Sequence, residues 1–253
     1  MVHLFQESGQ AKTQSNLTQV LPETAWGTEP LPSGIPAEGR IVVTIARQFG
    51  SGGAEIGHIV AEKSKLHYVD YGIIEEVARR LGVDVQRAAR QDEQTAGMEG
   101  HILDAIRISN PFIINYGSLF NQPSIPTQSK ELAYLHLTQR VVLEQATEGD
   151  AVIVGRGSQF LLHNAPRTLH IYIFAPLPYR ISNVMELFHL NHTQAERLIE
   201  QRDYEHDSYL RRYYGADGHQ PSLYHLLINT SLFSLELAAD LIYQTLPVIK
   251  ELT

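Results

Sequence analysis

The sequence contains no cysteine among its 253 residues. This absence excludes disulfides, thiolate zinc sites, iron–sulfur clusters and a cysteine nucleophile. Positive charge is also scarce, because 20 Lys and Arg stand against 28 Asp and Glu, a net charge of -8. We therefore expect no broad basic surface for nucleic acid, and any anionic ligand must be held by a local group of cations.

Long apolar runs are missing as well. No segment approaches the about 18 consecutive apolar residues of a membrane helix. The first residues lack the basic start and apolar stretch of a secretory signal. These absences predict a cytoplasmic protein that does not bind membranes.

Residues 1–39 differ in composition from the rest of the chain. They contain Pro22, Pro30, Pro32 and Pro36 among small polar residues, and no apolar period is sustained there. This pattern predicts a flexible proline-rich tail, followed by one domain over residues 40–253.

Short apolar segments rich in β-branched residues predict strands buried on both faces of a parallel sheet. Between them lie stretches with helical periodicity, including 73–149, 193–214 and 232–246. The expected strands are 41–46, 67–70, 151–154, 169–175 and 226–228. The alternation predicts an α/β fold, a three-layer doubly wound sheet of five parallel strands.

A glycine-rich turn follows the first expected strand and opens a helix, a place that suits phosphate. It matches no standard motif fully, because Gly53 stands where a P-loop has its lysine. Gly50 and Gly52 fit the dinucleotide fingerprint, but Glu55 occupies its third glycine. Asp70 has the spacing of a ribose-binding acid. The turn alone leaves a phosphate cradle and a dinucleotide site open.

Further segments follow one another in the order of a known family. They are VVTIARQFGSGGAEIG, LHYVDYGII, AVIVGRGSQFLL, LHIYIFAPLPYRI, RLIEQRDYEHDSYLRRYYG and LLINTSLFSLELAADLI. The chain resembles the cytidylate kinase-like proteins, within the P-loop nucleoside monophosphate kinases. The resemblance implies a P-loop kinase fold, a helical acceptor-binding insert at 73–149 and a lid at about 193–219.

The resemblance also implies a reaction, ATP-dependent phosphoryl transfer to a nucleoside monophosphate, CMP-like, or to a related small phosphate acceptor, with Mg²⁺. The implied ATP-binding residues are Gly50, Ser51, Gly52, Gly53, Ala54 and Glu55, of which Glu55 would also contact the metal. The implied catalytic cations are Arg47, Arg202, Arg211 and Arg212. The implied acceptor-binding residues are Asp70, Arg156, Asp203 and Asp207.

Departures from the family pattern keep other functions open. With glycine at 53, Arg47 is the candidate substitute cation, and Gly157 replaces the aspartate that contacts the ribose of CMP in cytidylate kinase. The alternatives are a nucleotide sensor without turnover and, more remotely, a dinucleotide-dependent oxidoreductase. The charged stretch around Arg202 also fits a solvated helix with internal salt bridges. A metallohydrolase is disfavoured, since the sequence has no H-E-x-x-H.

Overall fold

The computed structural model describes residues 31–70, 73, 76 and 127–251. Its core is a five-stranded sheet in the order β2-β3-β1-β4-β5, and every pairing is parallel. The strands are β1 (Val42–Arg47), β2 (His67–Val69), β3 (Ala151–Val154), β4 (Thr168–Phe174) and β5 (Leu226–Asn229). The predicted α/β class and the five parallel strands are thus confirmed.

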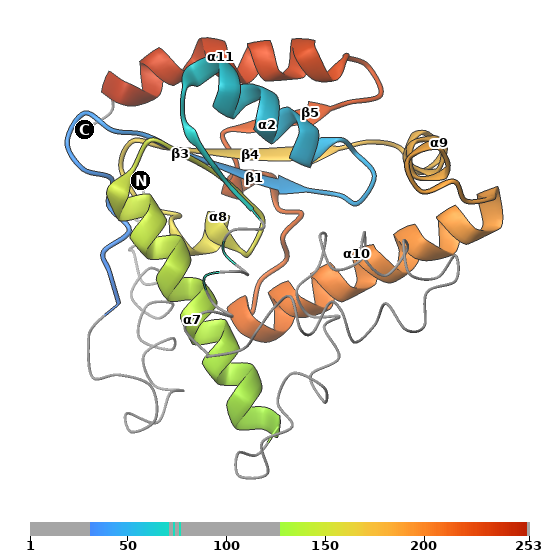
Figure 1. Cartoon of the computed structure of the whole chain (residues 1–253), viewed down its shortest axis with the longest axis horizontal. Coiled ribbons are helices and arrows are strands. Elements are labelled where there is room, and N and C mark those ends of the chain that lie inside the picture. Colours follow the sequence, from blue (N-terminus) through green and yellow to red (C-terminus); the bar gives the residue numbers. More distant parts are fainter. Residues whose placement is uncertain (1–30, 71–72, 74–75, 77–126, 252–253) are drawn as a thin grey trace, which may run out of the picture. The chain divides into compact units, whose positions relative to one another are not determined.

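Helices cover both faces of this sheet (Figure 1). On one face α2 (Gly53–Ser64) packs beside α11 (Leu235–Glu251), and on the other lie α7 (Thr127–Glu148) and the short α8 (Ser158–Leu161). The chain then continues from β4 into α9 (Leu177–Phe188) and α10 (His192–Tyr214), and a 3-10 turn (Pro221–Leu223) precedes β5. This three-layer arrangement confirms the predicted doubly wound fold.

Successive side chains of a strand point to opposite faces of the sheet, and the core is therefore divided into two apolar clusters, one on each face. In β1, Val43 and Ile45 join the cluster formed with α2 and α11, while Val42 joins the cluster formed with α7. All three side chains are fully buried. Successive strand residues point to opposite faces, so a strand covered on both sides must be apolar throughout. This requirement explains why the strands were recognisable in the sequence.

The folded unit begins earlier than the predicted boundary at residue 39. It starts at Pro32, and Gly34 and Pro36 are buried. Arg167 donates a hydrogen bond to the carbonyl of Pro36 (2.7 Å), and the Ala37 amide donates to Thr147 (3.2 Å). Pro32 and Pro36, which suggested a flexible segment here, belong to an irregular stretch whose backbone bonds to the domain. Residues 1–30 of the expected tail lie outside the described residues.

The expected helical insert at 73–149 is described only in part. Its last portion is α7, whereas residues 77–126 lie outside the described residues. The predicted helix at 193–214 corresponds to α10, which begins one residue earlier with a capping box between Asn191 and Gln194. Within the described part of the chain, no helix is long and apolar enough to cross a membrane.

Candidate active site

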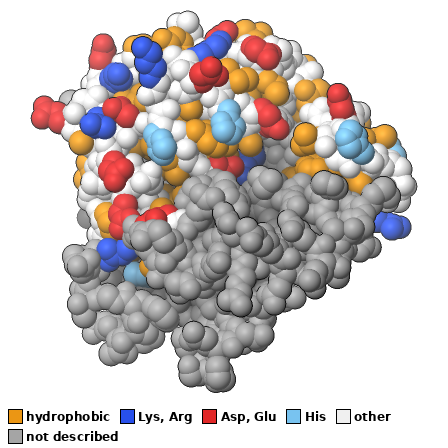
Figure 2. Space-filling view, in the orientation of Figure 1, with side chains coloured by type: hydrophobic (Ala, Val, Ile, Leu, Met, Phe, Trp, Pro, Cys, Tyr) orange, Lys and Arg blue, Asp and Glu red, His pale blue; other side chains and the backbone are white. Residues whose placement is uncertain are grey.

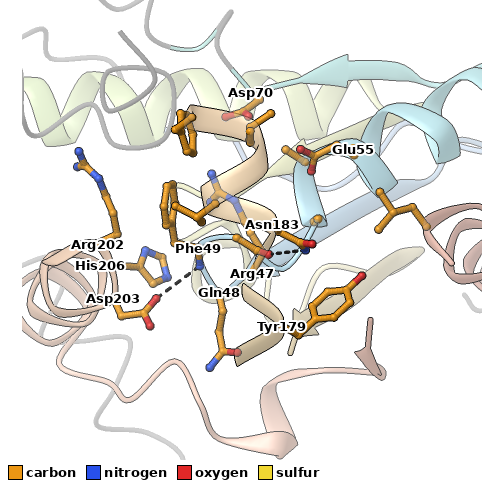
Figure 3. A pocket seen from close by; sticks show the side chains of 18 of the residues that line it. Arg47, Gln48, Phe49, Glu55, Asp70, Tyr179, Asn183, Arg202, Asp203 and His206 are labelled. Atoms are coloured by element: carbon orange, nitrogen blue, oxygen red, sulfur yellow. Dashed lines mark hydrogen bonds between the residues drawn. The ribbon is translucent and has the colours of Figure 1, made fainter. Parts of the chain in front are cut away.

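A cavity of about 520 Å³ lies at the carboxyl ends of the strands. The glycine-rich turn after β1, the ends of β1 and β2, the turn after β3, and helices α9 and α10 contribute its lining (Figure 3). Open α/β sheets bind ligands outside the carboxyl ends of the strands, at the point where the chain switches from one side of the first strand to the other. Here that point is β1, which lies between β3 and β4. The position supports the site that the glycine-rich turn predicted.

The glycine-rich turn requires glycine at two positions. Gly50 and Gly52 have φ angles of 78° and 82°, in the left-handed region. A Cβ atom at Gly50 would lie 2.8 Å from Val184, and one at Gly52 would lie 2.6 Å from Leu235. The turn leads directly into the first residues of α2, whose amides have no partner within the helix. Because these residues line the cavity, they form a place for an anion.

Neighbouring elements hold this turn in place. Asn183 of α9 donates to the carbonyl of Gly50 (3.1 Å), and the Thr230 hydroxyl donates to the carbonyl of Ser51 (2.8 Å). Ser51 is itself fully buried, and its hydroxyl donates to the carbonyl of Gln48 (2.8 Å). The Ser51 side chain therefore supports the turn from behind and does not line the cavity.

Arg47 runs from the end of β1 between two glycines. An ideal Cβ at Gly53 would lie 2.5 Å from the Cβ of Arg47, and one at Gly155 would overlap the guanidinium. Burial lowers the pKa of Arg47, and the nearby carboxylate of Asp70 opposes that shift. A guanidinium nevertheless stays protonated in proteins. The side chain of Arg47 thus begins beside Gly53, the position where a P-loop has its lysine, and places its guanidinium at Gly155.

Arg156 projects from a turn with an unusual backbone. Gly155, Arg156 and Gly157 have φ angles of 75°, 62° and 69°, three left-handed residues in succession. Arg156 is buried and lies 3.5 Å from Asp70, a buried ion pair at the ends of β3 and β2. Its Nε has no partner among the described residues. An arginine held this way keeps hydrogen-bonding capacity for an anionic ligand.

The turn of Arg156 is packed against the end of α10. The Tyr214 hydroxyl donates to the carbonyl of Arg156 (3.1 Å), and a Cβ atom at Gly157 would overlap the Tyr214 ring. Gly157 stands where the resemblance expected an aspartate for the ribose of the acceptor. The tyrosine fills the space next to this position, so an aspartate does not fit there.

Helix α10 presents one face to the cavity. Arg202, His206 and Tyr209 line it at the spacing of one helical face, and Asp203 beside them also lines it. Arg202 is buried and donates to Glu205 (2.9 Å), while its Nε and Nη2 have no partner among the described residues. Arg211 and Arg212 are exposed and do not line the cavity. Nine residues along the helix place Arg211 opposite Arg202, whereas Arg212 lies about 80° from Arg202 around the axis and more than two turns further along it.

The predicted acceptor acids of α10 lie in different surroundings. Asp203 accepts from Arg180 (2.6 Å) and from the Phe49 amide (3.4 Å), and Arg180 also donates to the carbonyl of Phe49 (3.2 Å). Asp203 thus connects α10 to the glycine-rich turn (Figure 3). Asp207 lies outside the cavity lining, 3.5 Å from His219, and burial raises its pKa.

Several lining residues were not identified from the sequence. His206 lies one turn after Arg202, so the helical period could have pointed to it. Tyr179 and Asn183 line the cavity from α9, where only the three-dimensional fold brings them to the turn. Phe49 stacks on Phe188 with centroids 5.9 Å apart, which gives this side of the cavity an apolar wall.

The one predicted metal contact is Glu55, which is exposed in the first turn of α2 and lines the cavity. The described residues contain no group of three His, Asp or Glu that could hold a metal ion. Mg²⁺ is commonly bound by one or two carboxylates together with substrate phosphates. Glu55 fits that pattern, in which phosphate oxygens complete the coordination.

Comparison with known proteins identifies the family. A model of the cytidylate kinase-like family matches residues 42–232, most of the chain, and the protein belongs to this family. A cytidylate kinase of Staphylothermus marinus is 26% identical over 80% of this chain and 94% of its own length. One from Sulfolobus acidocaldarius is 25% identical over 79% of this chain and 91% of its own length.

The fold is shared with a solved structure of an uncharacterised protein from Eubacterium ventriosum. It has a TM-score of 0.54 and 17% sequence identity, and the match covers 82% of this chain and 99% of the other. The parallel sheet with its glycine-rich turn after β1 is the fold of P-loop kinases, as the resemblance implied.

Proposed function

We propose that the protein transfers the γ-phosphoryl group of ATP to a nucleoside monophosphate or a related small phosphate acceptor. The observation that carries this proposal is the position of Arg47, which lies in the space left by Gly53 at the glycine-rich turn. Its side chain starts beside Gly53 and carries the guanidinium to Gly155, so a P-loop without its lysine keeps one cation in the lining of the same cavity. The names of the archaeal relatives support nucleotide kinase activity.

The donor nucleotide would bind over the glycine-rich turn. Gly50 and Gly52 let the backbone approach the phosphates, and the first turn of α2, with Gly53, Ala54 and Glu55, would face the β-phosphate. Mg²⁺, when bound with ATP, bridges phosphate oxygens and neutralises their charge. Glu55 is the residue placed to orient that ion or its water ligands.

The acceptor would lie on the side of Arg156 and Asp70. Phosphoryl transfer needs donor and acceptor in line, with cations around the transferred group. Arg47, Arg156 and Arg202 line the same cavity from three separate elements. Their guanidinium forks match phosphate geometry, so we assign Arg156 to the acceptor phosphate and Arg47 and Arg202 to the transferred group.

Recognition of the acceptor nucleoside differs from the family pattern. Tyr214 packs on Gly157 and leaves no room for the ribose-contacting aspartate. Asp70 is buried beside Arg156, where it positions that arginine. We therefore propose a phosphate acceptor as the substrate class, with CMP as the first candidate to test.

Activity is tested on the full chain with MgATP and a panel of nucleoside monophosphates, by the formation of ADP. We expect turnover with at least one acceptor and loss of turnover in Arg156→Met, with Arg211→Met as an exposed control. ADP formation that does not depend on any acceptor would contradict the proposal.

The second candidate is a nucleotide-binding protein without turnover, which the glycine at position 53 favours. It predicts that ATP raises the unfolding temperature while no product forms with any acceptor. A titration with NADH tests the dinucleotide alternative in the same assay. We expect no binding, because Glu55 stands where the dinucleotide fingerprint has its third glycine.

A further inference from the structure

His206 is a titratable residue in the cavity to which the proposed reaction gives no role. It lies on the cavity face of α10, one turn after Arg202 (Figure 3). Tyr209, three residues further along the helix, lines the same cavity. The described residues provide no hydrogen-bond partner for its imidazole. Both ring nitrogens are therefore available to a ligand, and an imidazolium donates from both.

Two arginines and a second histidine from different elements influence this imidazole. Arg47 at the end of β1, Arg156 after β3 and His219 after α10 all lower the pKa of His206, and burial contributes most. The pKa falls from 6.5 to about 3, so the residue is neutral at pH 7. The site without ligand thus contains a neutral histidine among arginines.

The acidic groups nearby are engaged with other residues. On α10, Asp203 bonds to Arg180 and the Phe49 amide, and Asp207 lies next to His219. At the end of β2, Asp70 pairs with Arg156. The remaining groups of this helix face that could affect the imidazole are Arg202, paired with Glu205, and the Tyr209 phenol. Without a ligand, no carboxylate among these compensates a charged imidazole.

We propose that His206 is a direct ligand of the bound phosphate group between Arg47 and Arg156, and that it enters the complex as an imidazolium. Phosphate binding then takes up one proton from solvent, which forms the second N–H bond of the ring. This inference rests on the proposed nucleotide binding and adds a residue to the phosphate site. Arg202 and His206, one helical turn apart, would contact the same anion from α10.

The charge of the ligand is sufficient for this protonation. At an effective dielectric constant of about 20, two negative charges about 4 Å away raise the pKa of an imidazole by about six. Against a pKa of about 3 without ligand, a shift in this direction favours the imidazolium form of His206 when the phosphate is bound. The same residue is thus neutral without ligand and cationic with it.

Calorimetry of the full chain tests this linkage with ADP and with pyrophosphate, both without Mg²⁺. Binding enthalpies in buffers of different ionisation enthalpy give the number of protons taken up at pH 7.5. We expect wild type to take up about one proton more than His206→Gln. The Kd of wild type for ADP should rise by up to about tenfold per pH unit between pH 7 and 8.5, relative to the variant.

His192→Gln is the matched control, because His192 lies on the same helix with its side chain 66% exposed, outside the cavity. It should keep the wild-type proton uptake. Since His206→Gln could also affect folding, NMR of histidine-labelled wild type provides a second measurement. One imidazole should change from neutral to charged when ADP binds at pH 7.5.

Equal proton uptake by wild type and His206→Gln, or no histidine that becomes charged on ADP binding, would overturn this inference alone. If wild type binds neither probe, the proposed function and this inference are both contradicted. Binding of ADP or pyrophosphate to wild type therefore distinguishes failure of this inference from failure of the proposed function.

Discussion

The side chain of Arg47 occupies the space that any residue larger than glycine would need at position 53. An ideal Cβ there would lie 2.5 Å from the Arg47 Cβ and 3.0 Å from its Cγ. The guanidinium continues to Gly155, where a Cβ atom would overlap it. A lysine at 53 and an arginine at 47 therefore exclude each other, and the pair supplies one cation to the site.

The exclusion predicts strong coupling between these two positions. Gly53→Lys alone should destabilise the protein by about 1–3 kcal/mol, because it overpacks a buried site. In the double variant Arg47→Gly/Gly53→Lys, the space for a lysine is restored. We expect the double variant to be more stable than the sum of the single changes predicts, as measured in a double-mutant cycle by denaturant unfolding. Additive changes would contradict the packing of Arg47 on Gly53.

A second prediction concerns the contact between Gly157 and Tyr214. Gly157→Ala should destabilise the protein by more than Gly215→Ala. Both glycines have positive φ angles, 69° and 60°, but only a side chain at 157 meets the tyrosine ring, whereas at 215 the space is open. The difference in free energy of unfolding isolates the clash, and we expect about 1–3 kcal/mol. Equal effects would show that Tyr214 does not restrict position 157.

A third prediction concerns the link between α10 and the glycine-rich turn. Asp203→Asn removes the charge that pairs with buried Arg180 and weakens the contact with the Phe49 amide. Leaving a buried arginine without its partner should cost about 1–3 kcal/mol of stability. We expect weaker ATP binding as well, measured by titration, because the turn loses one of its supports. Glu196→Gln, an exposed change on the same helix, is the control.

A fourth prediction separates the arginines of α10. Arg202→Met should lower kcat by about 100-fold, because it removes a cation from the cavity. Arg211→Met should leave kcat near wild type, since Arg211 is exposed on the opposite side of the helix. Thermal unfolding of both variants shows whether they fold. A larger loss of kcat in Arg211→Met than in Arg202→Met would contradict our assignment of Arg202 as the catalytic cation of α10.

A fifth prediction concerns acid stability and lies at the opposite end of the sheet. His170 is buried in β4, where Nδ1 lies 2.7 Å from the Thr44 hydroxyl and Nε2 lies 3.1 Å from the carbonyl of Leu162. Because a carbonyl only accepts, Nε2 carries the proton and Nδ1 accepts from Thr44. Burial, together with His225, lowers the pKa of His170 to about 4.

The sign of the pH effect follows from this pKa. The unfolded chain takes up a proton at His170 near pH 6.5, while the folded protein does so only near pH 4. Stability should therefore decrease as the pH falls from about 6.5 to about 4, by up to about 3 kcal/mol from this residue. His170→Gln should flatten the pH dependence of unfolding, and His192→Gln should not. An unchanged slope in His170→Gln would contradict the assignment.

The sheet could be predicted from the sequence because each buried strand is an apolar run. The predicted segment 151–154 and β3 coincide, and the other strands agree within about a residue at each end. Burial on both faces leaves little choice of residue, so the signal is local. The irregular segment from Pro32 was missed because its order depends on hydrogen bonds to Thr147 and Arg167, which are distant in sequence.

The candidate site was only partly predictable. Proximity to a motif suggested Arg211 and Arg212, but both are exposed and outside the cavity lining, and the helical period places Arg211 opposite Arg202. The same period would have indicated His206. The functions of Gly53 and Gly157 could not be read from the sequence, because each makes room for a side chain from another element, Arg47 and Tyr214.

The close packing of Arg47 on Gly53 also restricts the order in which such a loop can evolve from a lysine-containing ancestor. An arginine arising first at position 47 would collide with the lysine, whereas a glycine arising first at 53 leaves a gap that the arginine can later fill. The path through glycine passes a stage with neither cation.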